Sequence, residues 1–308
     1  MYPMLFDFEN LALRCFYGVK EVEAESESPN YQIWEYMVFN SVYRMLFKER
    51  VNEIVIALDS QSSWRKIVYP EYKANRKKKK EESNVNWELF HEKKNNFLEE
   101  MKNNLPFKII GANRAEADDI IGVLVNHNRL KNPIIVSMDC DYMQLSKKAR
   151  IYNPIKKEFK PSEDPEKFLV YSSLAGQSKD NLLNVKTPSD WPEDRKKPPM
   201  GEKGIQKLIL NEELDSFLDT PIEYEYKDED DKVIYKASVL PRERYELNRK
   251  LIDFNCTPKV IVEKTLEVYD KYEIYSDPND LYVYFKSKGW NEVLDNFTQV
   301  ESKMLELY

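Results

Sequence analysis

Three short apolar runs in the 308-residue chain each lead directly into an aspartate. An apolar run of this length between polar segments predicts a strand buried on both faces of a parallel sheet. The carboxyl ends of parallel strands share one edge, where α/β proteins place their ligands. We therefore expect the three carboxylates to converge. The runs and their aspartates are Met4–Phe6 with Asp7, Ile54–Leu58 with Asp59, and Ile134–Met138 with Asp139.

Five further acids are expected near this edge, because they follow a strand-end aspartate, open a predicted helix, or follow the segment 176–179 in the helical half. They are Asp141, Glu116, Asp118, Asp119 and Asp180. So many carboxylates repel one another unless a cation neutralises them. Oxygen ligands favour Mg²⁺, with Mn²⁺ as a substitute, and the number of acids favours two ions about 3.5–4 Å apart. Zinc is disfavoured, since the chain has only two histidines and three cysteines.

Each acid taken alone has a plain structural explanation. An aspartate after a strand commonly caps a turn or a helix. Acids in a first helical turn, such as Glu116 and Asp119, complement the helix dipole. Capping explains the whole set less well than it explains one member, so a metal site is the interpretation that we favour.

One segment, residues 65–80, holds a dense cluster of positive charge. It contains eight Lys or Arg and one Glu, so its charge is +7; since the whole chain carries −7, the remainder carries −14. Cation clusters neutralise phosphates, and Tyr69 and Tyr72 offer faces on which bases stack. Cations beside metal-bound acids suit a phosphodiester. For residues 77–80 alone, a solvated surface run is the alternative, since two glutamates follow it.

The elements that position these residues alternate between strands and helices as far as about Tyr152. Such alternation predicts an α/β fold with a mostly parallel central sheet flanked by helices. Beyond that point most segments are predicted to be helical. We therefore expect an α/β domain that holds the acidic site at 1–152 and a mainly helical domain at 153–308.

The expected elements beyond the three runs are one strand, a series of helices and one ambiguous segment. The strand is Phe107–Ile110, and the earlier helices are Gln32–Glu49, Trp87–Asn104 and Ala117–Arg129. The later helices are Pro165–Ala175, Gly201–Leu210, Pro241–Phe254, Pro258–Lys271 and two near the C-terminus. Ile222–Val239 is either a hairpin or a disordered insert.

Composition excludes several other kinds of site. The seven glycines form neither G-x-G-x-x-G nor a Walker motif, so those phosphate-binding loops are absent. Three cysteines without C-x-x-C spacing argue against a disulfide framework, and two histidines argue against a Ser-His-Asp triad. Tyr2–Phe6 meets two acids at once, unlike a signal peptide, and no apolar run approaches about 20 residues. We expect a soluble, cytoplasmic monomer without membrane contact.

Five ordered blocks of this sequence resemble the flap endonuclease (5′ nuclease) family over about residues 1–210. A Pro-rich stretch that follows the fifth block resembles the phage branch of that family. The blocks are LFDFENLALR (5–14), ALDSQSSWRKIVYPEYKANR (57–76), EADDIIGVL (116–124), SMDCDYMQL (137–145) and GQSKDN (176–181).

The resemblance implies a PIN-like 5′ nuclease fold with a helical arch at about 65–104 and a helical duplex-DNA-binding domain. It implies Mg²⁺-dependent 5′→3′ exonuclease and flap endonuclease activity with ribonuclease H activity, which removes RNA primers and 5′ flaps in DNA replication. The substrates would be DNA and RNA–DNA hybrids with 5′ ends or flaps. A single-stranded DNA-binding protein and a sliding clamp would be partners.

The same resemblance assigns roles to individual residues. All eight acids would form the metal shell, and Asp119 and Asp139 would act in catalysis with Lys73, which would reach the scissile phosphate. The nucleic-acid contacts would be Arg65, Lys66, Tyr72, Lys73, Arg76, Lys77, Lys78 and Lys203. Lys203 lies in G-E-K-G, which resembles a helix–turn–helix variant that holds one duplex strand; an ordinary helix start is the alternative.

One position departs from the family pattern: Gln177 stands where many members have an aspartate, so we expect a weaker second metal site. Two other functions compete. A haloacid-dehalogenase-like phosphatase also places acids at strand ends, but its first-strand D-x-D is D-x-E here, at Asp7–Glu9. A catalytically weakened DNA-binding scaffold would have lost acids, and Gln177 is the candidate loss.

Overall fold

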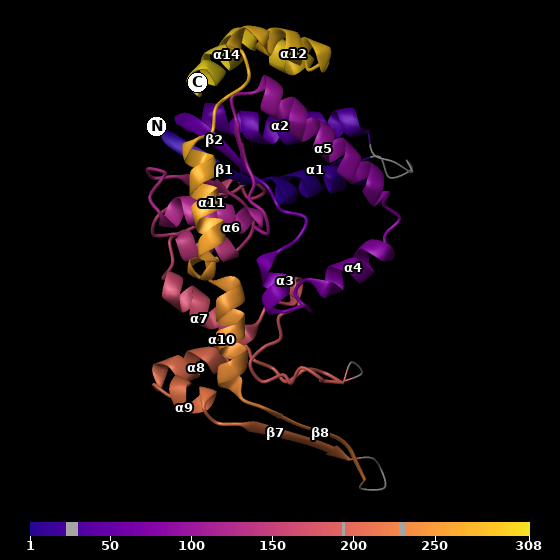
Figure 1. The fold of residues 1–308 in the computed structure, drawn as a ribbon, viewed down its shortest axis with the longest axis vertical. Coiled ribbons are helices and arrows are strands. Elements are labelled where there is room, and N and C mark those ends of the chain that lie inside the picture. The colour runs from indigo at the N-terminus through magenta and orange to yellow at the C-terminus, as the bar shows by residue number, and fades with distance from the viewer. Residues whose placement is uncertain (23–29, 193–194, 228–231) are drawn as a thin grey trace. The chain divides into compact units, whose positions relative to one another are not determined.

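The computed structural model (Figure 1) describes residues 1–22, 30–192, 195–227 and 232–308, and it contains a six-stranded sheet. The strands are β1 (Tyr2–Asp7), β2 (Val51–Ala57), β3 (Lys108–Ile110), β4 (Ile134–Val136), β5 (Arg150–Asn153) and β6 (Glu158–Phe159). Their order is β3-β2-β1-β4-β5-β6. Neighbouring strands from β1 to β5 pair in parallel, and β6 pairs antiparallel with β5.

The central strand β1 is buried on both faces, which explains its unbroken apolar sequence. Met4 and Phe6 belong to the main hydrophobic core, and Leu5 between them is equally buried. All four predicted strands are present, so the expected α/β class with a mostly parallel sheet is confirmed. The short strands β5 and β6 were not among the predicted elements.

The chain folds as two compact units, and both are discontinuous in sequence. The first comprises residues 1–64, 82–162 and 257–308, and the second comprises 65–81 and 163–256. This partition differs from the expected division at 152/153, since the last segment belongs with the N-terminal sheet. The expected functional division into a nuclease domain and a duplex-binding domain stays a prediction.

The helices of the first unit cover the sheet and complete its core. They are α1 (Phe8–Val22), α2 (Tyr31–Lys48), α5 (Trp87–Asn104), α6 (Ala117–Asn126), η1 (Asp141–Leu145), α11 (Lys259–Asp270), η4 (Pro278–Asp280), α12 (Leu281–Ser287), α13 (Asn291–Asp295) and α14 (Phe297–Leu305). Helix α6 packs on β1 and β2, while α11 packs on α6 and β3. None of the helices within the described residues is long and apolar enough to cross a membrane.

Aromatic side chains explain why residues 257–308 return to the first unit. Phe39 of α2 stacks on Trp290, with 4.5 Å between ring centroids, and its ring lies 5.4 Å from that of Phe285 in α12. Phe285 is fully buried. Burying such a side chain contributes about 1.5–3 kcal/mol, so this part of the core is incomplete without the C-terminal helices.

The second unit is mainly helical, as predicted, with one hairpin. Its elements are α4 (Ala74–Glu81), α7 (Pro165–Ala175), η2 (Ser178–Asp180), α8 (Glu202–Leu210), α9 (Leu214–Leu218), β7 (Ile222–Lys227), β8 (Val233–Val239), α10 (Pro241–Ile252) and η3 (Phe254–Cys256), while α3 (Trp64–Val68) begins at the unit boundary. The ambiguous segment Ile222–Val239 is an antiparallel hairpin. Its residues 228–231 lie outside the described residues.

The predicted arch segment, about 65–104, is divided between the two units. Helix α4 belongs to the second unit, and α5 belongs to the first. The predicted helix Trp87–Asn104 coincides with α5. The arch itself stays a prediction.

Phe285→Ala should lower the free energy of unfolding by about 3–5 kcal/mol, because it leaves a cavity between α2 and the C-terminal helices. Thermal or urea unfolding measures the change. Val283→Ala in the same helix is the matched control, since Val283 is 63% exposed. Equal stability of the two variants would contradict the assignment of residues 257–308 to this core.

Candidate active site

Three aspartates of the first unit stand at the carboxyl ends of adjacent parallel strands. Asp7 is the last residue of β1, Asp59 follows β2, and Asp139 follows β4. Strand β1 pairs with β2 on one side and with β4 on the other, so the three strand ends are neighbours. The sheet topology therefore brings these residues to one edge.

The side chain of Tyr142, in η1, interacts electrostatically with four of the carboxylates. This tyrosine is buried. Burial, and then the negative charges of Asp7, Asp118, Asp139 and Asp59, raise its pKa well above the ordinary value. All four charges therefore act on one phenol beside the carboxyl edge of the sheet.

Backbone N–H groups hold the strand-end carboxylates in position. Asp7 Oδ1 accepts from the N–H of Asn10, at 3.0 Å, in the first turn of α1. Asp59 Oδ1 accepts from the N–H of Ala117, at 2.8 Å, and so ties the end of β2 to the start of α6. Asp139 Oδ1 accepts from the N–H of Asp141 at 3.0 Å. Such bonds stabilise the ionised carboxylate.

Asp119 is enclosed in the protein, unlike the exposed Asp59 and the partly exposed Asp7, Asp118 and Asp139. It is 0% exposed, and its Oδ2 accepts from the N–H of Glu116 at 2.9 Å and from Trp64 Nε1 at 3.1 Å. Its Oδ1 accepts from the hydroxyl of Thr257 at 3.1 Å. Asp119 and Glu116 form the capping box that begins α6.

The donor chemistry of this edge fits a hard divalent cation. The side chains that gather there are carboxylates, whereas His91 lies among the rings of Trp87 and Phe90 on α5. Within the described residues, no group of three or more acids, histidines or cysteines is arranged so that it could hold a metal ion. A cation such as Mg²⁺ keeps several waters and needs only one or two carboxylates, so an open cluster suits it.

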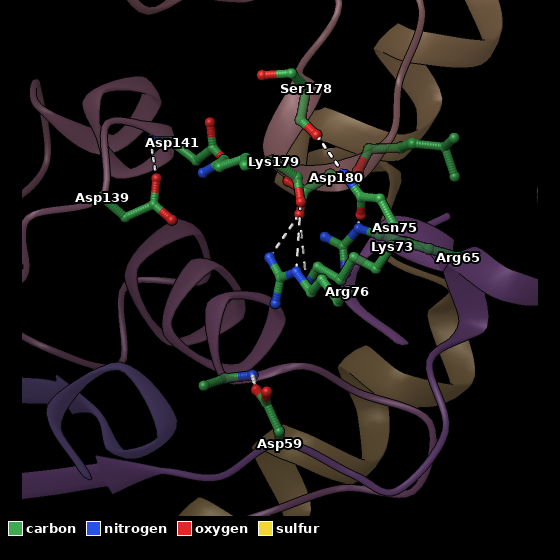
Figure 2. Close-up of polar contacts among 12 residues, drawn as sticks. Asp59, Arg65, Lys73, Asn75, Arg76, Asp139, Asp141, Ser178, Lys179 and Asp180 are labelled. Carbon is green, nitrogen blue, oxygen red and sulfur yellow. Dashed lines mark hydrogen bonds and ion pairs between the residues drawn. The ribbon is translucent and has the colours of Figure 1, made fainter. Parts of the chain in front are cut away.

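In the second unit, Asp180 pairs with two cations of the basic segment (Figure 2). Arg76 Nη2 lies 2.8 Å from Asp180 Oδ1, and Lys73 Nζ lies 3.9 Å from the same oxygen. The backbone N–H of Lys73 also donates to the Asp180 carbonyl at 2.9 Å. Asp180 thus belongs to the second unit, whereas the other seven predicted metal ligands belong to the first.

Lys73 has a left-handed backbone, with φ at 57°. A non-glycine residue in this region costs roughly 1–2 kcal/mol, so the surrounding contacts must hold it there. The two bonds to Asp180 supply that restraint, and Lys73 Nζ also lies 4.9 Å from the ring centroid of Tyr72. The conformation fixes the direction in which the Lys73 side chain leaves the chain.

The block at 176–181 has a backbone shape that its residue types explain. Gly176 has φ at +68°, and a Cβ there would lie 2.5 Å from the carbonyl oxygen of Leu182. Gln177 forms an antiparallel bridge with Leu182. Asn181 is left-handed and donates from its side-chain amide to the Glu71 carbonyl at 2.9 Å. The block therefore positions Asp180 against the basic segment.

Comparison with known families decides what this arrangement is. A family model described as 5′-3′ exonuclease, N-terminal resolvase-like domain, matches residues 3–169, which is more than half of the chain. The chain belongs to the 5′-3′ exonuclease family. It is therefore a nuclease. A second model, T4 RNase H, C terminal, matches residues 164–300.

Individual relatives agree with the family. The chain is 27% identical over 290 residues to ribonuclease H of Enterobacteria phage T4, a match that covers 89% of each. A flap endonuclease of bacteriophage T5, solved with DNA and metal ions, has a TM-score of 0.61 at 16% identity. A mutant 5′-exonuclease of T5 has a TM-score of 0.56 at 15% identity. Each structural match covers 87% of this chain and 98% of the other, and confirms the 5′ nuclease fold.

Two residues predicted to contact nucleic acid in this exonuclease are interior instead. Arg65 is 1% exposed, and its Nε donates to the Leu251 carbonyl at 2.7 Å. Tyr72 is 3% exposed and packs with Leu169 and Leu182. These placements correct the prediction, because both side chains build the core of the second unit and present no surface to a ligand.

The other predicted contacts of the exonuclease lie at the surface where they are described. Lys66, Lys77, Arg76 and Lys203 are exposed, and Lys203 lies in the first turn of α8. The side chain of Lys78 lies outside the described residues. Their roles in binding stay predictions.

The three hydrogen bonds of Asp119 position the start of α6. The roles in catalysis and metal binding predicted for Asp119 stay predictions. Tyr142 was not predicted, because a search for charged side chains passes over a phenol. Its position directly after Asp141 in the strand-end block is the signal that would have indicated it.

Gly176→Ala should destabilise the second unit by roughly 1–3 kcal/mol or more, because Ala is strained at this φ and its Cβ meets the Leu182 carbonyl. Gly204→Ala is the control, since nothing lies within 4 Å of its Cβ position. That control should be neutral or stabilising by up to about 1 kcal/mol, as in any helix. Urea unfolding of both variants checks the opposite signs; equal effects would refute the account.

Proposed function

We propose that this nuclease is a divalent-metal-dependent, structure-specific 5′ nuclease that hydrolyses phosphodiesters near 5′ ends and flaps with two Mg²⁺ ions. The observation that carries the proposal is the placement of Asp7, Asp59 and Asp139 at the carboxyl ends of three adjacent parallel strands. The T5 relative solved with DNA and metal ions supports both the metal dependence and the substrate class.

The carboxylates of the first unit are the proposed ligands. Asp7, Asp59, Asp118 and Asp139 hold the ions, with Glu116 and Asp141 at the margin of the site. These residues would hold Mg²⁺, which when bound would lower the pKa of its water and offset negative charge on the leaving oxygen. Backbone N–H groups orient the carboxylates of Asp7, Asp59 and Asp139.

Asp119 acts as a positioning residue, because it fixes the first turn of α6, from which Asp118 projects. Lys73 stabilises negative charge that develops on the scissile phosphate, and Arg76 holds the 5′ strand; both roles rest on the family resemblance. A ligand role for Asp180 rests on the same resemblance. Contacts to phosphates carry little sequence information, so cleavage depends on structure rather than on base sequence.

The proposed substrates are DNA and RNA–DNA hybrids with 5′ ends or flaps. The match to a phage ribonuclease H supports RNA removal, and hence a role in removing primers during replication. A single-stranded DNA-binding protein, a sliding clamp and a monomeric state stay predictions.

The competing functions make different demands. A phosphatase of the haloacid dehalogenase type hydrolyses small phosphate esters and needs no basic segment. A scaffold without catalysis binds DNA and leaves it intact. Incubation with a 5′-flap duplex, whose flap is DNA or RNA, with and without Mg²⁺, separates all three. Cleavage that requires Mg²⁺ supports the proposed nuclease, and no cleavage of either flap would refute it.

Asp139→Asn should reduce cleavage roughly 100-fold or more and leave DNA binding intact. The amide keeps the Oδ1 acceptor for the Asp141 N–H but removes the charge, and metal stabilisation of a transition state is worth several kcal/mol. Single-turnover cleavage and binding in Ca²⁺ measure the two effects. Asp295→Asn, at an exposed site in α13, is the charge-matched control. Full activity in Asp139→Asn would overturn the metal assignment.

Gln177→Asp should lower the Mg²⁺ concentration required for half-maximal cleavage several-fold. The substitution adds a carboxylate beside the Asp180 block, where many family members have one. Titration of cleavage against Mg²⁺ checks the shift. Gln206→Asp, on the exposed side of α8, controls for added charge. An unchanged Mg²⁺ profile would show that Gln177 does not weaken metal binding.

A further inference from the structure

The first unit has a second concave site, lined by α1, α2 and the turn between β5 and β6. Its volume is about 420 Å³. Four cations line it, namely Arg14, Arg44, Lys48 and Lys157, and no carboxylate does. None of the predicted metal ligands or nucleic-acid contacts belongs to this lining.

The contacts of these cations are with neutral groups. Arg44 Nε donates to Asn40 Oδ1 at 3.0 Å. Lys48 Nζ donates to the phenol oxygen of Tyr152 and, at 3.4 Å, to the carbonyl of Lys157. Within the described part of the chain, none of the four cations forms an ion pair. Four like charges that converge without a counter-charge favour an anion between them.

The carboxylate nearest in sequence is already engaged elsewhere. Glu49 follows Lys48 directly, and it pairs with Arg150, with Nη1 and Oε2 3.2 Å apart. Arg150 in turn lies 3.8 Å from the ring centroid of Phe159. The positive charge of the pocket is therefore left for an external ligand.

The neutral lining indicates what kind of anion fits. Hydroxyl and amide groups of Ser41, Asn40 and Tyr152 stand among the cations, and Met45 and Ile155 add an apolar wall. Arg, Lys, Ser, Asn and Tyr side chains are the groups that bind nucleic-acid phosphates. Arginine presents paired donors to phosphate oxygens, and the apolar wall suits a sugar.

The pocket also lies within reach of the strand-end acids. Arg14 comes seven residues after Asp7 along α1, about 10 Å of helix. That length equals about three nucleotide steps along a duplex strand. Tyr152 pairs with Val136 of β4, three residues before Asp139. One nucleic-acid chain at the acids is long enough to reach both places.

We propose that this pocket binds a backbone phosphate of the nucleic-acid substrate, as a contact separate from the acids and from the basic segment. The proposal extends the proposed function, because it gives the same substrate a second anchoring point. It adds affinity that depends on salt and not on base sequence.

Removal of two pocket cations should make DNA binding less sensitive to salt. The double variant Arg44→Gln/Lys48→Gln changes exposed side chains. In EDTA, fluorescence anisotropy of a labelled 5′-flap duplex across a NaCl series gives the slope of log affinity against log salt. The slope should become shallower by about 1.4–1.8, since each phosphate contact contributes about 0.7–0.9. Affinity at about 0.1 M salt should fall roughly tenfold.

Two further variants keep this test decisive. Lys131→Gln/Lys147→Gln removes two exposed cations of the same unit outside the pocket, and should keep the parent slope. Lys157→Gln, which removes no side-chain contact within the described residues, should reduce the slope by about 0.7–0.9. It therefore tests the pocket even if the double variant unfolds. Parent-like slopes in folded pocket variants would overturn the proposal.

A labelled oligoglutamate peptide tests whether the pocket binds an acidic protein segment in place of a nucleic acid. If the pocket variants lose the peptide but keep the parent slope with DNA, the site binds acidic protein segments and the nucleic-acid proposal is wrong. Because binding is measured without a divalent ion, the outcome is independent of cleavage. A parent that cleaves nothing would refute the proposed function and leave the pocket result standing.

Discussion

A single buried carboxylate holds together the places where the chain leaves and re-enters the first unit. Trp64 is the last residue of one segment of that unit, and Thr257 is the first residue of another. Both donate to Asp119, which also accepts the N–H that begins α6. A buried charge is costly unless its hydrogen bonds are complete, so these donors and the carboxylate depend on one another. The direction of α6, and with it the place of Asp118, follows from this cluster.

The first unit also brings several negatively charged carboxylates to one edge of its sheet and stabilises them there. Three parallel strands end side by side, and each delivers an aspartate. Backbone N–H groups at helix starts and turns donate hydrogen bonds to Asp7, Asp59 and Asp139, and these bonds stabilise the carboxylates. The enclosed phenol of Tyr142 stays protonated in their combined field. The negative charge at this edge favours a cation, and a hard ion such as Mg²⁺ would retain several of its waters there.

The sequence predicted the parts of the fold that depend on local pattern. The four apolar strands and α5 follow from runs and periodicity, and the acids at strand ends follow from parallel topology. Strands β5 and β6 were not predicted, because Arg150–Asn153 and Glu158–Phe159 are short and mixed in polarity. The exposure of a side chain depends on the whole fold. The sequence of the basic segment therefore does not show that Arg65 is buried and donates to the carbonyl of Leu251. Helical periodicity likewise does not show which part of the protein the helices of residues 257–308 will pack against.

The return of the C-terminal helices has a consequence for synthesis on the ribosome. The sheet and its acids are encoded early, yet Phe39 meets Phe285 and Trp290 only when the last helices have emerged. Domains generally fold as units during synthesis, but this unit lacks part of its core until residues 257–308 have been synthesised. A nascent chain therefore carries the strand-end acids before it has a finished scaffold for them. The core of the first unit is therefore complete only after residues 257–308 have joined it.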